Sequence, residues 1–173
     1  MTKSPILVTG CAGFIGMSTA KRLLSEGETV IGVDNFSTYY SVDLKKDRVK
    51  NLTHPNFHFF EVDISDKEAM GEIWRKFEPK RVINLAAQAG VRYSITHPFS
   101  YINSNVIGFL VLLELARYQD GFEHMVYAST SSIYGSNKTM PFDEDQMTAT
   151  PISLYAATKT SNEMMAQAYN YLY

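Results

Sequence analysis

The chain has 173 residues, of which 45% are apolar and 20% are charged, and 16 Lys and Arg against 18 Asp and Glu give a formal net charge of −2. This composition lacks the basic surplus of proteins that coat nucleic acid, and no apolar run approaches the roughly 20 residues of a membrane span. The single cysteine, Cys11, excludes an internal disulfide and is typical of a reducing compartment. We therefore expect a cytoplasmic protein that binds neither nucleic acid nor a membrane.

Strand-like and helix-like segments alternate along the whole chain. Short β-branched or aromatic runs predict five strands, at residues 6–9, 29–34, 57–62, 81–86 and 124–129. Helical periodicity predicts the helices that follow these strands, at residues 13–26, 41–52, 66–76, 100–118 and 153–173. The helix at 41–52 is charged, and we expect it to be mostly exposed.

This alternation predicts an α/β fold, a doubly wound parallel (Rossmann) sheet with helices on both faces. Right-handed crossovers then give the strand order 3-2-1-4-5. The last helix ends without a glycine, a proline or a basic last turn, and the fifth strand leaves an open sheet edge. We therefore expect residues 1–173 to form one domain of a larger protein.

A glycine-rich loop at residues 9–16 joins the first strand to the first helix. Gly10 permits a tight turn, Gly13 lets the backbone approach a pyrophosphate, and Gly16 lets the helix pack near the sheet. The N-terminus of the helix offers unpaired N–H groups to an anion. The spacing is G-x-x-G-x-x-G, and glycines also mark ordinary turns, so this loop alone leaves both interpretations open.

Acidic residues follow the second and third strands. Asp34 lies where a carboxylate can accept hydrogen bonds from an adenosine ribose, which favours NAD over NADP because a 2′-phosphate would be repelled. Asp63 is placed to hold the adenine amine. The alternatives are that Asp34 only begins a turn and that Asp63 is a solvated residue at the end of a strand. Cys11 is expected to be a small packed residue, since no basic partner adjoins it.

Tyr155 and Lys159 lie one turn apart on one face of the last predicted helix. An ammonium group beside a phenol favours the phenolate, so this pair is typical of a general base. Tyr134 and Lys138 have the same spacing, but they span Gly135 directly after a strand, where no helix is expected. We therefore assign the base to Tyr155 and Lys159.

Hydroxyl side chains follow the fifth strand at residues 129–132. This is the carboxyl edge of the sheet, where doubly wound folds bind their ligands. A hydroxyl here can bond the substrate oxygen that Tyr155 deprotonates. The alternative is a simple hydroxyl-rich turn.

As a set, these residues resemble the extended short-chain dehydrogenase/reductase family, and within it the nucleotide-sugar epimerases and dehydratases. The matching motifs are T-G-x-x-G-F-I-G at 9–16, D-N at 34–35, D-I at 63–64, L-A-A at 85–87, N-V-x-G at 105–108, S-T-x-x-x-Y-G at 129–135 and Y-x-x-x-K at 155–159. The resemblance implies NAD as cofactor and Tyr155, Lys159 and Thr130 as catalytic residues. It implies the following cofactor contacts: Gly10, Gly13, Phe14, Ile15, Gly16, Asp34, Asn35, Asp63, Ile64, Leu85, Ala86, Ala87, Asn105, Ser129, Tyr155 and Lys159.

Residues 34–45 and 86–94 are similar to the UDP-glucuronate 4-epimerases. Thr130 is followed by Ser131 and Ser132, where the sugar 4,6-dehydratases carry Asp-Glu, so we expect no elimination of water. The implied reaction moves a hydride from C4 of the sugar to NAD while Tyr155 takes the O4 proton, and returns it to the other face of the 4-keto sugar. Arg92 and Ser131 are the expected substrate contacts; the alternative for Arg92 is an ordinary surface arginine.

The resemblance also implies a homodimer through the helices at 100–118 and 154–173, and a C-terminal substrate region that these 173 residues lack. We therefore expect this chain to bind NAD but not to turn over a UDP-sugar alone. The alternatives are a UDP-glucose 4-epimerase, a related dehydratase and a non-catalytic NAD-binding module. The four histidines are scattered, so we predict no metal site.

Overall fold

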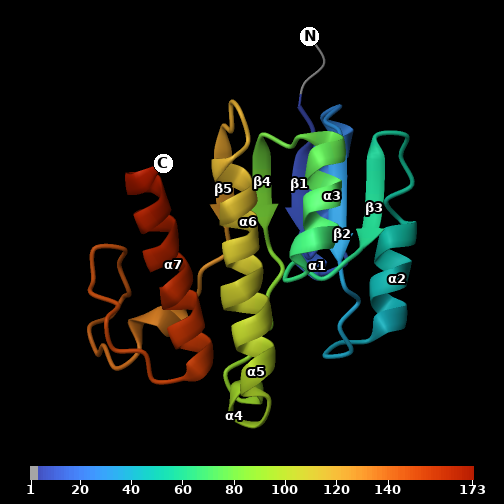
Figure 1. Cartoon of the computed structure of the whole chain (residues 1–173). Helices are drawn as coiled ribbons and strands as arrows, with labels where there is room; N and C mark the ends of the chain where they lie inside the picture. Colours follow the sequence, from blue (N-terminus) through green and yellow to red (C-terminus); the bar gives the residue numbers. More distant parts are fainter. Residues whose placement is uncertain (1–3) are drawn as a thin grey trace.

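The computed structural model describes residues 4–173, and its five parallel strands form one sheet in the order β3-β2-β1-β4-β5 (Figure 1). The strands are β1 (Ile6–Thr9), β2 (Val30–Asp34), β3 (Phe57–Glu61), β4 (Arg81–Asn84) and β5 (His124–Tyr127). Thr9 at the end of β1 lies beside Val33 on one side and Asn84 on the other, so the carboxyl ends of the three central strands are level. The predicted α/β class and strand order are confirmed.

Helices follow the strands as the alternation predicts. They are α1 (Phe14–Ser25), α2 (Val42–Lys50), α3 (Lys67–Phe77), the short α4 (Tyr93–Thr96) and α5 (Pro98–Tyr101), α6 (Gly108–Arg117) and α7 (Leu154–Leu172). A 3-10 helix (Ser131–Tyr134) follows β5. The predicted ends of the strands, and of all helices except the one at 100–118, lie within two residues of the observed ends.

The predicted helix at 100–118 is composite. It runs from α5 through a π-helical segment (Ile102–Ile107) into α6. The wider π turn is typical of functional sites, and it contains Asn105, which is 2% exposed. Periodicity did not predict this change of helical pitch, nor the short helix α4.

Two apolar layers cover the sheet. On one face, Leu7 and Ile31 pack against Met70 and Trp74 of α3 and against Leu112 of α6. A second cluster joins side chains of β1 and β2 to α1 and to Leu52, two residues after α2; it consists of Ile6, Val8, Cys11, Ala20, Leu24, Val30 and Leu52. Figure 1 shows α3 and α6 over the sheet, and α7 packs beside α6 and the π-helical segment.

One helical stretch, Pro98–Arg117, is long and apolar enough by composition to cross a membrane, contrary to our estimate from apolar runs. Its apolar side packs on the sheet, where Phe109 and Leu112 are fully buried. Core helices of globular domains pass the same test, so this stretch is weak evidence for a span.

Candidate active site

A pocket of about 670 Å³ opens at the carboxyl ends of the central strands. This volume lies within the usual range for small-molecule sites. Of the predicted cofactor contacts, twelve line it: Gly10, Gly13, Phe14, Ile15, Gly16, Asp34, Asn35, Asp63, Ile64, Leu85, Ala86 and Ala87. The structure therefore brings the glycine loop, the ends of β2 and β3 and the segment after β4 to one cavity.

The glycine loop depends on close backbone contacts. Gly10 has a φ of +66°, and a Cβ there would lie 2.7 Å from the Ala86 nitrogen. A Cβ on Gly16 would overlap with the Gly10 carbonyl oxygen. Helix α1 begins after Gly13 without a side-chain cap, and its first residues line the pocket, so its N–H groups are available to an anion.

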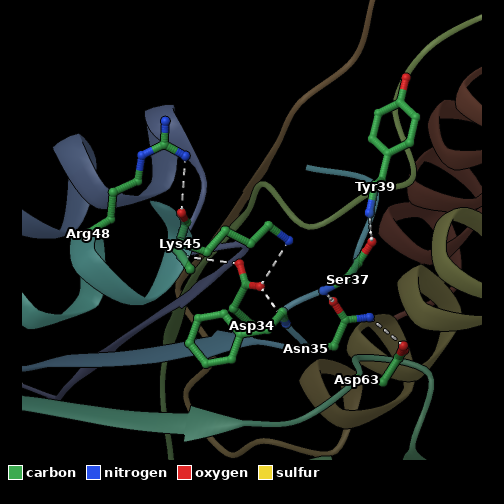
Figure 2. A network of polar contacts seen from close by, with 9 residues as sticks. Asp34, Asn35, Ser37, Tyr39, Lys45, Arg48 and Asp63 are labelled. Atoms are coloured by element: carbon green, nitrogen blue, oxygen red, sulfur yellow. Dashed lines mark hydrogen bonds and ion pairs between the residues drawn. The ribbon is translucent and has the colours of Figure 1, made fainter. Parts of the chain in front are cut away.

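Asp34 is 6% exposed and ties the end of β2 to the glycine loop. Its Oδ2 accepts the Ala12 N–H at 3.1 Å, and its Oδ1 accepts the Phe36 N–H at 2.9 Å (Figure 2). The Lys45 ammonium lies 3.5 Å from Oδ1. The Arg48 guanidinium donates to the Ala12 carbonyl at 3.4 Å, so helix α2 supports the same loop.

The helix at 41–52 is mostly exposed, as predicted, but Lys45 is an exception, because its side chain lies inward and the residue is 8% exposed. Sequence reasoning missed both Lys45 and Arg48 as pocket residues. Lys45, Arg48 and Leu52 recur at helical spacing, and this stripe is the signal that points to an inward face.

Asp63 accepts hydrogen bonds from Asn35 Nδ2 at 2.7 Å and from the backbone and hydroxyl of Ser65 at 2.9 and 2.7 Å (Figure 2). Burial raises the pKa of the Asp63 carboxyl, but the hydrogen bonds from Ser65 and Asn35 outweigh it and hold the pKa below its usual value. A charged carboxylate therefore remains at the far end of the pocket.

Asn105, a predicted cofactor contact, is not among the residues that line the pocket. Its Oδ1 accepts the Gln88 N–H at 2.8 Å, and its Nδ2 donates to the Gln88 carbonyl and to Thr158 Oγ1, each at 3.1 Å. Its side chain thus holds the pocket-lining loop after β4 against α7.

Lys159 lies on α7, whose first turn is capped by Ser153, and it is 5% exposed. Its ammonium donates to the carbonyl of Ala128, a pocket residue directly after β5, at 2.8 Å. Burial lowers the pKa of Lys159 to about 8, and the negative charge of Glu163 opposes this shift. Ser129 does not line the pocket; its hydroxyl donates to Glu163 at 2.5 Å.

Tyr155 is half-buried four residues before Lys159, and its ring lies 6.0 Å from the Tyr101 ring in an edge-on arrangement. The Tyr101 hydroxyl donates to the carbonyl of the pocket residue Ala89 at 2.8 Å. Lys159 therefore contacts the pocket wall directly, whereas Tyr155 lies next to Tyr101, which in turn bonds to a wall residue.

Thr130 accepts the Ser132 N–H at 3.2 Å and begins the 3-10 helix. Ser131 and Arg92 are exposed, and neither lines the pocket. The excluded pair, Tyr134 and Lys138, shares no helix, as predicted.

Cys11 is fully buried, and burial together with the charge of Asp34 raises the pKa of its thiol. This confirms a packed residue and not a nucleophile. Within residues 4–173, no group of three His, Cys, Asp or Glu side chains is gathered as a metal site would require.

The parallel sheet, the glycine loop, the acidic residue after β2 and the Tyr-x-x-x-Lys helix define a Rossmann domain of the short-chain dehydrogenase/reductase type. Residues 7–173 match the family described as GDP-mannose 4,6 dehydratase, and the chain belongs to that family.

Known relatives agree with this class. The chain is 48% identical to protein CapI of Staphylococcus aureus over 168 residues, which are 97% of this chain and 50% of CapI. It is 43% identical to UDP-glucuronate 4-epimerase 4 of Arabidopsis thaliana over 168 residues, 97% of this chain and 38% of that protein. This chain therefore spans half or less of the length of these relatives.

Among solved structures, the chain is similar to a UDP-glucuronic acid 4-epimerase from Bacillus cereus in complex with UDP-glucuronic acid and NAD. The TM-score is 0.88 at 32% identity, over 97% of this chain and 52% of that one.

Proposed function

We propose that residues 1–173 form the NAD-binding domain of an NAD-dependent nucleotide-sugar 4-epimerase, which interconverts UDP-glucuronate and UDP-galacturonate. The observation that carries the proposal is the pocket at the carboxyl ends of β1, β2 and β4, which adjoins the Tyr-x-x-x-Lys helix. Relatives and a structural neighbour named as UDP-glucuronate epimerases support the choice of sugar.

The residues present fit a dinucleotide. The glycine loop leaves room that a Cβ would fill, and the free N–H groups of α1 suit a pyrophosphate. The carboxylates of Asp34 and Asp63, which line the pocket together with Asn35, offer hydrogen-bond acceptors to the adenosine half of the dinucleotide. We assign the remaining contacts to Phe14, Ile15, Ile64, Leu85, Ala86 and Ala87, which line the cavity, and to Ser129, Tyr155 and Lys159 beside it.

NAD, when bound, supplies the acceptor and donor of the C4 hydride. Tyr155 then takes the proton of the sugar O4 and returns it after the ring has presented its other face. Lys159, while protonated, stabilises the phenolate form of Tyr155. Thr130 donates to the same sugar oxygen, and Ser131 and Arg92 are the proposed substrate contacts.

Epimerisation is favoured over 4,6-dehydration, even though the family carries a dehydratase description. Dehydration requires an acid that expels a hydroxyl as water. The 3-10 helix after Thr130 presents Ser131 and Ser132, which are poor acids.

UDP-glucose, whose sugar carries an uncharged hydroxymethyl group in place of the carboxylate, is the second candidate substrate. A UDP-glucose 4-epimerase from Thermus thermophilus in complex with NAD has a TM-score of 0.84 to this chain at 35% identity, over 98% of this chain and 51% of that one.

We further propose a cytoplasmic homodimer. Exposed apolar side chains on α6 and α7, Leu110 and Met164 among them, offer a face that two copies can cover. Light scattering during size exclusion is expected to show a dimer. A Met164→Glu variant is expected to be monomeric, and a monomeric unmodified chain would contradict this interface.

Two experiments test the main proposal. Titration of the chain with NAD, monitored by calorimetry, is expected to give saturable binding with one NAD per chain; a folded chain that does not bind NAD would overturn the proposal. Next, the protein that contains residues 1–173 is assayed with UDP-glucuronate. Formation of UDP-galacturonate that Tyr155→Phe abolishes supports an epimerase, and NAD binding without conversion of either UDP-sugar would favour a non-catalytic module.

A further inference from the structure

Lys45 is a buried cation on an otherwise exposed helix. It lines the dinucleotide pocket and is 8% exposed, whereas its neighbour Lys46 lies on the exposed face of α2. Removal of an ammonium group from water is costly unless it is paired, so a buried lysine at a pocket wall requires an explanation.

Asp34 explains this burial only in part. The 3.5 Å separation between Lys45 Nζ and Asp34 Oδ1 is at the outer limit of a hydrogen bond. An ammonium has three donors, and within residues 4–173 Asp34 is the one polar partner recorded for Lys45. Two donors therefore remain for the pocket.

The acceptor capacity of Asp34 is limited in turn. An ionised carboxylate offers about four lone-pair sites. The N–H groups of Ala12 and Phe36 and the ammonium of Lys45 occupy three of them, which leaves one on Oδ2. Asp34 can therefore accept from one further hydroxyl but not from two.

A ribose presents two neighbouring hydroxyls, each able to donate and to accept. This inference rests on the proposed function, in which the adenosine ribose lies at Asp34. We propose that Lys45 is a specificity-determining residue for the cofactor: its ammonium donates to one hydroxyl of the adenosine ribose while Asp34 accepts from the other. One ribose hydroxyl then acts as an acceptor and the other as a donor, so the pair recognises an unsubstituted diol. Figure 2 shows the two side chains facing each other.

The test measures dissociation constants for NAD and for two NAD analogues that lack the 2′- or the 3′-hydroxyl of the adenosine ribose. In the unmodified chain, loss of either hydroxyl is expected to weaken binding about tenfold, the size of one charge-assisted hydrogen bond. In Lys45→Met, loss of one of the two hydroxyls should change the dissociation constant less than about twofold, while loss of the other remains costly because Asp34 is intact.

Lys46→Met is the matched control on the exposed face of the same helix, and it should behave as the unmodified chain. Lys45→Gln is a second variant in case Met leaves Asp34 too poorly compensated for folding. Its amide can face Asp34 but is too short to reach the ribose as well, so it should also lose the dependence on one hydroxyl.

The outcomes separate this proposal from the proposed function. Hydroxyl dependence that is unchanged in Lys45→Met and Lys45→Gln would overturn the role of Lys45 while NAD binding stands. Absence of NAD binding in the unmodified, folded chain would overturn the proposed function and this inference with it.

Discussion

The buried ammonium of Lys159 donates a hydrogen bond to the carbonyl of Ala128, at 2.8 Å. Ala128 lies at the carboxyl end of β5 and forms part of the pocket wall, whereas Lys159 belongs to a helix that begins only at Leu154. This one contact therefore connects the pocket to the helix that carries the proposed base. The contact also holds the ammonium of Lys159 in a buried position, where burial lowers its pKa.

The stability of the chain should depend on pH through Lys159. Its pKa falls from 10.5 to about 8 on folding, so the folded state releases the proton first. The free energy of unfolding should be insensitive to this group below pH 8 and should rise between pH 8 and about 10.5, by on the order of 3 kcal/mol. Urea unfolding of the chain and of Lys159→Met across this range isolates the effect, because other titrations cancel in the difference. Parallel curves for the two proteins would contradict the assignment.

Glu163 should control the titration of Lys159. Its negative charge raises the pKa of Lys159. The pKa of Tyr127 is raised mainly by burial, and the charge of Glu163 adds to this shift. Glu163→Gln keeps an acceptor for the Ser129 hydroxyl but removes the charge. We expect the pKa of Lys159 to fall below about 8, as followed by carbon NMR of its side chain. Glu72→Gln, on the exposed face of α3, should leave the pKa of Lys159 unchanged. An unchanged pKa of Lys159 in Glu163→Gln would refute the interaction.

Two glycine-to-alanine changes in helices should have opposite effects on stability. A Cβ at Gly16 would overlap with the Gly10 carbonyl, so Gly16→Ala should lower the free energy of unfolding by about 2 kcal/mol or more and weaken NAD binding. At Gly71 in α3 the nearest atom is the flexible end of Arg75, 3.3 Å away. Gly71→Ala should therefore raise stability by about 0.5–1 kcal/mol through helix propensity alone. Equal effects in denaturant melts would argue against the close packing of α1.

Asn105 should be important for stability although it does not line the pocket. Asn105→Ala leaves both backbone groups of Gln88 without partners in a buried setting, which should cost about 2–4 kcal/mol in the free energy of unfolding. Asn103→Ala, which removes one exposed hydrogen bond to Ser65, should cost under about 1 kcal/mol. Chemical denaturation of the two variants compares them directly, and similar losses would show that the buried network is not the stabilising element.

Much of the fold could be predicted because two general constraints act together. Alternating strand and helix patterns require a parallel sheet, and right-handed crossovers leave few strand orders. The glycine loop and Asp34 were also predictable as neighbours, since both follow strands whose carboxyl ends meet at one edge.

The missed features depend on contacts between distant residues. Lys45 belongs to a helix dominated by charged residues, so composition predicts exposure. The helical spacing of Lys45 and Arg48 indicates an inward face, but the pairing of Lys45 with Asp34 on the preceding strand follows only from the fold. Asn105 matched a family motif, but its position behind the pocket loop depends on the π turn. No local sequence pattern predicts this turn. The link between Ser129 and Glu163 likewise joins two elements that only the folded chain brings together.

Both backbone polar groups of Ala12 are bound by side chains: its N–H donates to Asp34, and its carbonyl accepts from Arg48. A loop that is anchored in this way has little conformational freedom even before a ligand binds. Docking a pyrophosphate there should consequently demand little rearrangement of the loop, so differences in affinity between ligands should lie mainly in their dissociation rates.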